Sequence, residues 1–163
     1  MRFHLRPLGW RDARAVATWR YHGPYAIYNL DTFEMLTAML AQQVLNWLGA
    51  PYFYAVLDEE SALVGMFQLA RHGDTVEIGL GMRPDLTGKG LGLSFVQAGL
   101  DFGTERYAPA AFRLDVATFN QRARRVYERA GFRPVRTFTK YFGGRPYEAV
   151  EMIRESSAAR SPT

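Results

Sequence analysis

The chain has 163 residues, with 20 lysines and arginines against 16 aspartates and glutamates, and it contains no cysteine. This length fits one domain, and a hydrophobic content of 48% supplies enough apolar material for a core, which excludes a disordered chain. The lack of cysteine excludes disulfides, thiolate metal sites and a cysteine nucleophile. The three histidines, His4, His22 and His72, do not have the spacing of metal ligands, so we expect no metal site.

The formal net charge of +4 would suit a nucleic acid or a phosphorylated cofactor, and an ordinary solvated surface is the alternative. No apolar run approaches the roughly 20 residues that a bilayer-spanning helix needs, and no basic-then-apolar leader opens the sequence. We therefore expect a soluble, cytoplasmic protein without a membrane partner.

The first third of the chain predicts one strand and two helices. Alternation over residues 2–8 indicates a strand. Apolar residues then recur at helical spacing from residue 10 on, at Trp10, Ala13, Val16 and Ala17. After a loop, a second helix is expected over residues 31–49, because Asp31 and Glu34 have the spacing of a capping box.

The remaining two thirds alternate between strand and helix patterns. We expect strands at 51–58, 62–71, 75–82, 112–119, 135–142 and 145–153, and helices at 92–107 and 120–132. This order predicts one mixed α/β sheet in which only the strand–helix–strand segment near 76–116 must be parallel. We expect a single domain over residues 1–154 and a flexible tail over 155–163.

The stretch "RPDLTGKGLG" concentrates glycine between a predicted strand and a predicted helix. It is not a P-loop, because Lys89 is followed by glycine rather than serine or threonine, and its glycines lack the spacing of a dinucleotide-binding fingerprint. Glycines at a helix start also let a phosphate reach the exposed N–H groups there, and Lys89 would add a cation. A generic glycine-rich turn is the alternative.

A second motif, "NQRARRVYERAGF", begins at Asn120. Asn120 has the chemistry of a helix N-cap, and Tyr127 lies two turns further along the same helix face. Gly131 suits the position just after the helix. Packing in the core is the alternative role for Tyr127.

Taken together, the two motifs resemble the GCN5-related N-acetyltransferase (GNAT) family over roughly residues 76–132. The second motif carries this likeness at Asn120, Ala123, Val126, Tyr127, Glu128, Ala130, Gly131 and Phe132. The acetyl-CoA motif of that family, Arg/Gln-x-x-Gly-x-Gly/Ala, falls on Thr87, Gly90 and Gly92, so a threonine replaces the usual long side chain.

The resemblance implies a mixed, mostly antiparallel central sheet with flanking helices and a splayed strand pair. Acetyl-CoA is the implied co-substrate, and a backbone N–H near Leu80 to Met82 would polarise its thioester carbonyl. Glycines inside that strand, Gly79 and Gly81, fit a bulge or a close backbone approach. The implied cofactor contacts are Leu80, Gly81, Met82, Thr87, Gly88, Lys89, Gly90, Leu91, Gly92 and Asn120.

The implied reaction moves the acetyl group directly to a primary amine of a small molecule or a protein N-terminus. Tyr127 matches the family tyrosine that protonates the departing thiolate, and Glu77 matches the base of the histone-type members. A solvated strand position is the alternative for Glu77, with water as the base. A catalytically silent acyl-CoA-sensing domain is the alternative function, although it would not need Tyr127.

The acceptor side is indicated by aromatic residues. Tyr25, Tyr28 and Tyr52 could contact an ammonium or an aromatic amine, or they could pack the helices onto the sheet. Four arginines of the second motif, at positions 122, 124, 125 and 129, could meet nucleic acid or the phosphates of CoA. Because they lie on the helix expected beside the cofactor, we do not expect a nucleic-acid partner. The expected assembly is a monomer or a homodimer.

Overall fold

The computed structural model describes residues 1–29, 37, 53–142 and 144–156. The predicted second helix, its capping pair Asp31 and Glu34, and the proposed acceptor contact Tyr52 lie outside these residues. Most of the predicted tail, residues 157–163, also lies outside them.

Seven strands of the described chain form one mixed sheet in the order β1-β2-β3-β4-β5-β7-β6. The strands are β1 (His4–Pro7), β2 (Phe53–Leu57), β3 (Leu63–His72), β4 (Thr75–Met82), β5 (Ala111–Ala117), β6 (Arg133–Phe142) and β7 (Arg145–Glu155). The ladders β1/β2, β2/β3, β5/β7 and β6/β7 are antiparallel, whereas β4 and β5 pair in parallel. The predicted mixed, mostly antiparallel sheet is therefore confirmed, including its one parallel connection.

The parallel ladder between β4 and β5 is short. It joins Thr75–Glu77 to Ala111–Arg113, although β4 continues to Met82 and β5 to Ala117. A short ladder between two longer strands is what the expected splayed pair requires.

The helices are α1 (Trp10–Ala17), α3 (Gly92–Tyr107) and α4 (Gln121–Arg129), with short 3₁₀ turns η1 (Gly23–Tyr28) and η2 (Pro84–Leu86). The bounds of α3 are those expected from the sequence, and both 3₁₀ turns fall where only loop was expected. None of the helices in the described part of the chain is long and apolar enough to cross a membrane.

The chain divides into two compact units, each taken by itself below. The first consists of Met1–Leu69 and Leu80–Leu91, and the second of Ala70–Gly79 and Gly92–Thr163.

In the first unit, α1 packs its buried face into a small apolar core. This core comprises Leu8, Ala13, Val16, Ala17, Phe53, Ala55 and Met66, with Trp19 and Leu63 against it. Trp10 was expected on the same face, but it is 43% exposed. The prediction was wrong because Trp10 is the first residue of α1, and Asp12 and Ala13 take the buried positions of that turn.

The start of α1 is held by a buried carboxylate. Asp12 accepts hydrogen bonds from the Gly9 N–H at 2.8 Å and from both terminal nitrogens of Arg6, at 2.6 and 3.0 Å. Burial alone would raise the pKa of Asp12, but the hydrogen bonds from Arg6 and from the Gly9 N–H outweigh it and lower that pKa below its ordinary value.

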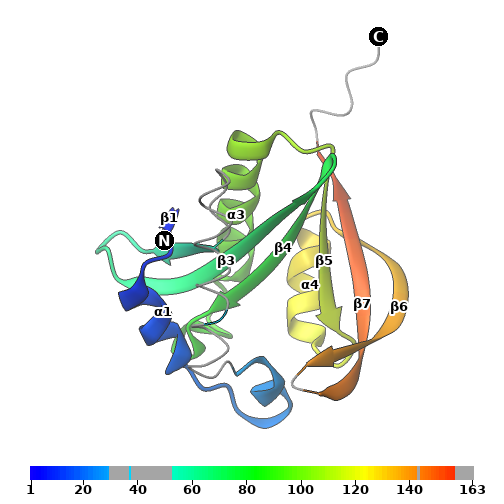
Figure 1. Ribbon diagram of the computed structural model, residues 1–163, viewed down its shortest axis with the longest axis horizontal. Helices are drawn as coiled ribbons and strands as arrows, with labels where there is room; N and C mark the ends of the chain where they lie inside the picture. The colour runs from blue at the N-terminus through cyan, green and yellow to red at the C-terminus, as the bar shows by residue number, and fades with distance from the viewer. Residues whose placement is uncertain (30–36, 38–52, 143, 157–163) are drawn as a thin grey trace. The chain divides into compact units, whose positions relative to one another are not determined.

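In the second unit, β5 alternates buried apolar residues with polar ones. Phe112, Leu114 and Val116 are buried on one face, and Arg113 and Asp115 lie on the other. Figure 1 shows β7 between β5 and β6, with α4 next to β5. The register places Asp115 opposite Glu151 and Glu151 opposite Arg136, so these side chains share the face of the sheet that carries Arg113.

Helices α3 and α4 approach each other closely at one glycine. A Cβ added to Gly92 would lie 3.0 Å from Cγ2 of Val126, tighter than nine in ten real Cβ contacts. Gly92 is thus the residue that lets the start of α3 pack on α4.

Candidate active site

The glycine-rich segment forms the turn between β4 and α3. Thr87 ends η2, where its hydroxyl donates to the Pro84 carbonyl at 2.8 Å. Gly88 and Gly90 follow with φ of +77° and +79°, a conformation that side chains disfavour. The sequence predicted all three glycines at the first turn of the helix, but only Gly92 lies in α3.

Gly90 is an open position of this turn. A Cβ added there would meet nothing within 4 Å, and Gly88, Lys89 and Gly90 are all exposed. An exposed backbone without side chains fits the close approach of a phosphate, with Lys89 as a nearby cation. The residues present therefore fit the pyrophosphate of a CoA cofactor.

The end of β4 is anchored by a tyrosine from the segment after α1. Tyr21 donates its hydroxyl proton to the Met82 carbonyl at 2.7 Å, and the same oxygen lies 3.5 Å from the Cβ position of Gly81. The bond fixes the carbonyl of Met82 within the segment whose N–H groups were expected to polarise a thioester. Nothing in the sequence could pair residues 61 positions apart.

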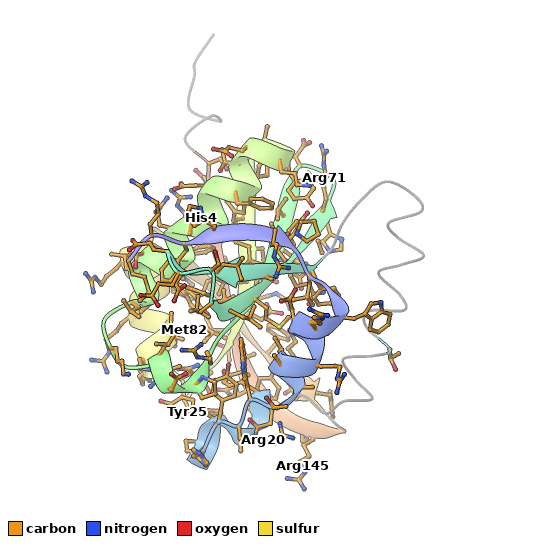
Figure 2. The ribbon with its side chains drawn as sticks, turned by 90° about the vertical axis from the view of Figure 1, so that its left-hand side faces the viewer. His4, Arg20, Tyr25, Arg71, Met82 and Arg145 are labelled. Carbon is orange, nitrogen blue, oxygen red and sulfur yellow. The ribbon has the colours of Figure 1, made fainter. Side chains whose placement is uncertain are left out.

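Two of the expected acceptor tyrosines lie on η1. Tyr25 and Tyr28 are partly buried there, and Figure 2 labels Tyr25 together with Met82 of β4. The residues on either side of this segment, Tyr21 and Asn29, are hydrogen-bonded to each other. Asn29 Oδ1 accepts from the Tyr21 N–H at 2.6 Å, and Asn29 Nδ2 donates to the Tyr21 carbonyl at 3.2 Å. These tyrosines therefore stand on a short segment with fixed ends.

In the second unit, Asn120 caps α4 as predicted. Its side-chain oxygen accepts from the Ala123 N–H at 3.1 Å, and the residue is 8% exposed. Gly131 follows the helix with φ of +93°, and the Phe132 N–H donates to the Tyr127 carbonyl at 2.9 Å. Both cap predictions are confirmed.

Tyr127 is the buried residue of α4, with 9% of its surface exposed. Its ring meets the edge of Phe132 with centroids 6.1 Å apart, a favourable aromatic contact. Tyr127 and Asn120 are seven residues apart on one helix, so they share its buried face. This contact supports a packing role, and an acid role for the hydroxyl remains a prediction.

Glu77 lies at the end of the parallel ladder, directly opposite Arg113. Its Oε2 accepts a hydrogen bond from Arg113 Nη2 and lies 3.6 Å from His72 Nε2. The hydrogen bond to Glu77, and the charges of Glu77, Glu151 and Asp115, raise the pKa of Arg113 despite its partial burial. The sequence identified Glu77 as a candidate base but not its partner, which is 36 residues away.

A second ion pair lies on the same face of the sheet. Lys140 of β6 donates to Asp115 Oδ2 of β5 at 2.8 Å. Burial lowers the pKa of Lys140, but the hydrogen bond and the charge of Asp115 outweigh this effect and raise it. Within the described residues, no three histidine, aspartate or glutamate side chains gather as metal ligands would.

The candidate residues are distributed over both units. Leu80–Leu91 belongs to the first unit, as do Tyr25 and Tyr28. The second unit holds Glu77, Gly92, Asn120 and Tyr127.

Comparison with known proteins identifies the family. A family model described as "Acetyltransferase (GNAT) domain" matches residues 2–133, which is most of the chain. A search of curated proteins found no match.

Solved structures of N-acetyltransferases share the fold over nearly the whole chain. The spermidine N-acetyltransferase of Vibrio cholerae in complex with CoA and spermine has a TM-score of 0.79 at 21% identity, covering 98% of this chain and 99% of that one. A chimera of the Vibrio cholerae and human enzymes gives 0.79 at 19% identity, covering 99% and 100%. A GNAT-family acetyltransferase from Bacillus anthracis gives 0.75 at 20% identity, covering 95% of each chain.

Proposed function

Because the chain belongs to the GNAT acetyltransferase family, we propose that it moves the acetyl group of acetyl-CoA to a primary amine. The observation that carries this proposal is the turn at Gly88 and Gly90. Its two glycines have left-handed backbone, and the Cβ position of Gly90 is open. This exposed backbone lies beside Lys89 and directly before α3, which gives a pyrophosphate room to reach the N–H groups of the turn.

Binding and orientation come first in the mechanism. The N–H groups of the turn would hold the phosphates, and Lys89 would add one positive charge. A backbone N–H among Leu80, Gly81 and Met82 would donate to the oxyanion that develops on the thioester carbonyl. Tyr21 keeps this backbone in place through its bond to the Met82 carbonyl.

The chemical step needs a base and an acid. The amine nitrogen forms a bond to the acetyl carbon and gives a proton to Glu77, and the carbon–sulfur bond breaks. The departing thiolate takes a proton from Tyr127, which recovers one from solvent. With no cysteine in the chain, transfer is direct and passes through no cysteine acyl-enzyme.

The acceptor is proposed as a small molecule with a primary amine, or a protein N-terminus. Tyr25 and Tyr28 on η1 offer aromatic faces that favour a cation. The similar Vibrio cholerae structure holds spermine, so polyamines belong among the first acceptors to try.

The proposal is tested by incubating the protein with acetyl-CoA and a panel of amines and measuring the release of free thiol. The panel contains polyamines, amino acids, aminoglycosides and peptides with free N-termini. Amine-dependent thiol release supports the proposal. Tight binding of acetyl-CoA without turnover of any acceptor would favour a sensing domain instead.

A further inference from the structure

Charges of alternating sign cross one face of the second unit, from β4 to the edge strand β6. The register places Glu77 of β4 opposite Arg113 of β5, and Glu151 of β7 opposite Arg136 of β6. Arg113 Nη2 donates to Glu77 Oε2, while Arg113 Nη1 lies 3.8 Å from Glu151 Oε2. Arg136 donates to both oxygens of Glu151, at 3.3 and 3.1 Å.

We propose that Arg113 is a positioning residue, which holds the Glu77 carboxylate in the orientation that accepts the amine proton. This inference rests on the proposed function, in which Glu77 is the base. An arginine suits the role because its two terminal nitrogens can meet two carboxylates at once, here Glu77 through Nη2 and Glu151 through Nη1, and its charge does not titrate at neutral pH.

The geometry leaves one oxygen of Glu77 for the reaction. Within the described residues, the contacts of its carboxylate with Arg113 and His72 both use Oε2. Oε1 is then the oxygen that receives the proton. The side chain of Glu77 is 34% exposed, so this oxygen can be reached from solvent.

Arg113 also lies next to a second carboxylate, that of Glu151. The side chain of Glu151 is only 14% exposed and is bound at both oxygens by Arg136. This fixed carboxylate lies 3.8 Å from Arg113 Nη1 and attracts the guanidinium electrostatically. Arg113 therefore stands between two carboxylates and can orient the outer one.

A purely structural role is the competing explanation, since the same pair closes the ladder between β4 and β5. The two explanations differ in whether the effect of Arg113 on kcat depends on the presence of Glu77. If Arg113 acts only on stability, its loss affects folding and leaves the chemical step unchanged whatever residue is at position 77. If it acts through Glu77, its effect on kcat disappears once the carboxylate is gone.

The experiment is a double-mutant cycle in kcat, measured with the best acceptor, using Arg113→Met, Glu77→Gln and the double variant. We expect Arg113→Met to lower kcat by about tenfold, as a misplaced base would, with the KM for acetyl-CoA unchanged. Arg113→Lys, which keeps the charge but has one nitrogen to share between the two carboxylates, should recover part of kcat. In the Glu77→Gln background, Arg113→Met should change kcat by less than about twofold.

The matched control is Arg133→Met. Arg133 pairs with Glu155 at 3.5 Å between β6 and β7 of the same sheet, and kcat should stay at the parent value. The inference would be overturned if Arg113→Met lowered kcat equally in both backgrounds, or if Glu77→Gln kept the parent kcat. Either result would leave the proposed acetyl transfer standing. A parent protein that acetylates no amine would overturn the proposed function and this inference together.

Discussion

The first residue of α3, Gly92, faces Val126 of α4 so closely that an added methyl group would require Val126 to shift. Its Cβ position is 3.0 Å from Val126 Cγ2 and 3.4 Å from Cγ1. Valine has one strongly preferred rotamer in a helix, so turning aside would cost it free energy. We expect Gly92→Ala to lower the free energy of unfolding by about 1–2 kcal/mol, measured by urea denaturation.

The same contact supplies its own control. In a Val126→Ala background the space is open, and Gly92→Ala should then cost much less, because alanine also reduces the freedom of the unfolded chain. An equal penalty in both backgrounds would show that packing on Val126 is not the reason for the glycine.

A substitution at Gly90 should weaken the binding of acetyl-CoA rather than disturb packing. Gly90→Val places a branched side chain where the pyrophosphate is proposed to lie, and the dissociation constant for acetyl-CoA should rise at least tenfold, or about 1.4 kcal/mol. Calorimetry measures this affinity. Gly73→Val is the matched control, because Gly73 also has a positive φ, +61°, and nothing within 4 Å of its Cβ position. Both variants should lose stability, and only the first should lose affinity.

Asn120→Ala should lower the free energy of unfolding by about 1 kcal/mol, since the cap on the Ala123 N–H is lost. Asn120→Ser keeps a capping oxygen and separates the two proposed roles. If Asn120 also contacts the cofactor, the serine variant is stable but binds acetyl-CoA more weakly. Full affinity in both variants leaves Asn120 as a cap only.

Tyr127→Phe tests the acid. The substitution keeps the ring that packs on Phe132 and removes only the hydroxyl. We expect kcat to fall by roughly 10², the lower end for a positioned acid, because a CoA thiol is itself a fair leaving group. Thiol release must be followed where chemistry limits turnover. Tyr141→Phe, at a position 68% exposed on β6, is the control and should keep the parent rate. An unchanged Tyr127→Phe variant would assign the proton to water.

Because the pKa of Asp12 is lowered in the folded protein, we expect the protein to lose stability in acid. The contribution of Asp12 is complete above the unfolded value of about 4 and is lost as the pH falls through the folded value. Asp12→Asn should cost about 1–2 kcal/mol at pH 7, and the difference from the parent should shrink below pH ~4. Urea denaturation across this range measures it. Asp85→Asn is the control, since the Arg83–Asp85 pair is solvent-exposed and its loss should leave stability unchanged.

Local chemistry made most of the fold predictable from the sequence. Alternation located β4, the run of apolar positions located α3, and Asn120 and Gly131 marked both ends of α4. In each case the deciding interactions lie within a few residues along the chain. Trp10 shows the limit, because the first turn of a helix can place an apolar residue outside the core.

The candidate site was predictable only where it depends on a local motif. The turn at Gly88 and Gly90 could be identified, because its glycines are adjacent to a strand and a helix. The partners of Glu77 and Met82 could not, because Arg113 and Tyr21 reach them through strand register and through a bond between distant segments. Register depends on the whole sheet, which no short motif encodes.

The two hydrogen bonds between Tyr21 and Asn29 make residues 22–28 a cassette, that is, a segment that can be replaced as a unit. Its two ends are tied to each other, so a segment of altered sequence can be grafted between them without changing how the chain enters or leaves. The Tyr21 hydroxyl would keep its hold on the Met82 carbonyl during such an exchange. If the segment contacts the acceptor as proposed, libraries confined to residues 22–28 would change the acceptor preference and leave the end of β4 intact.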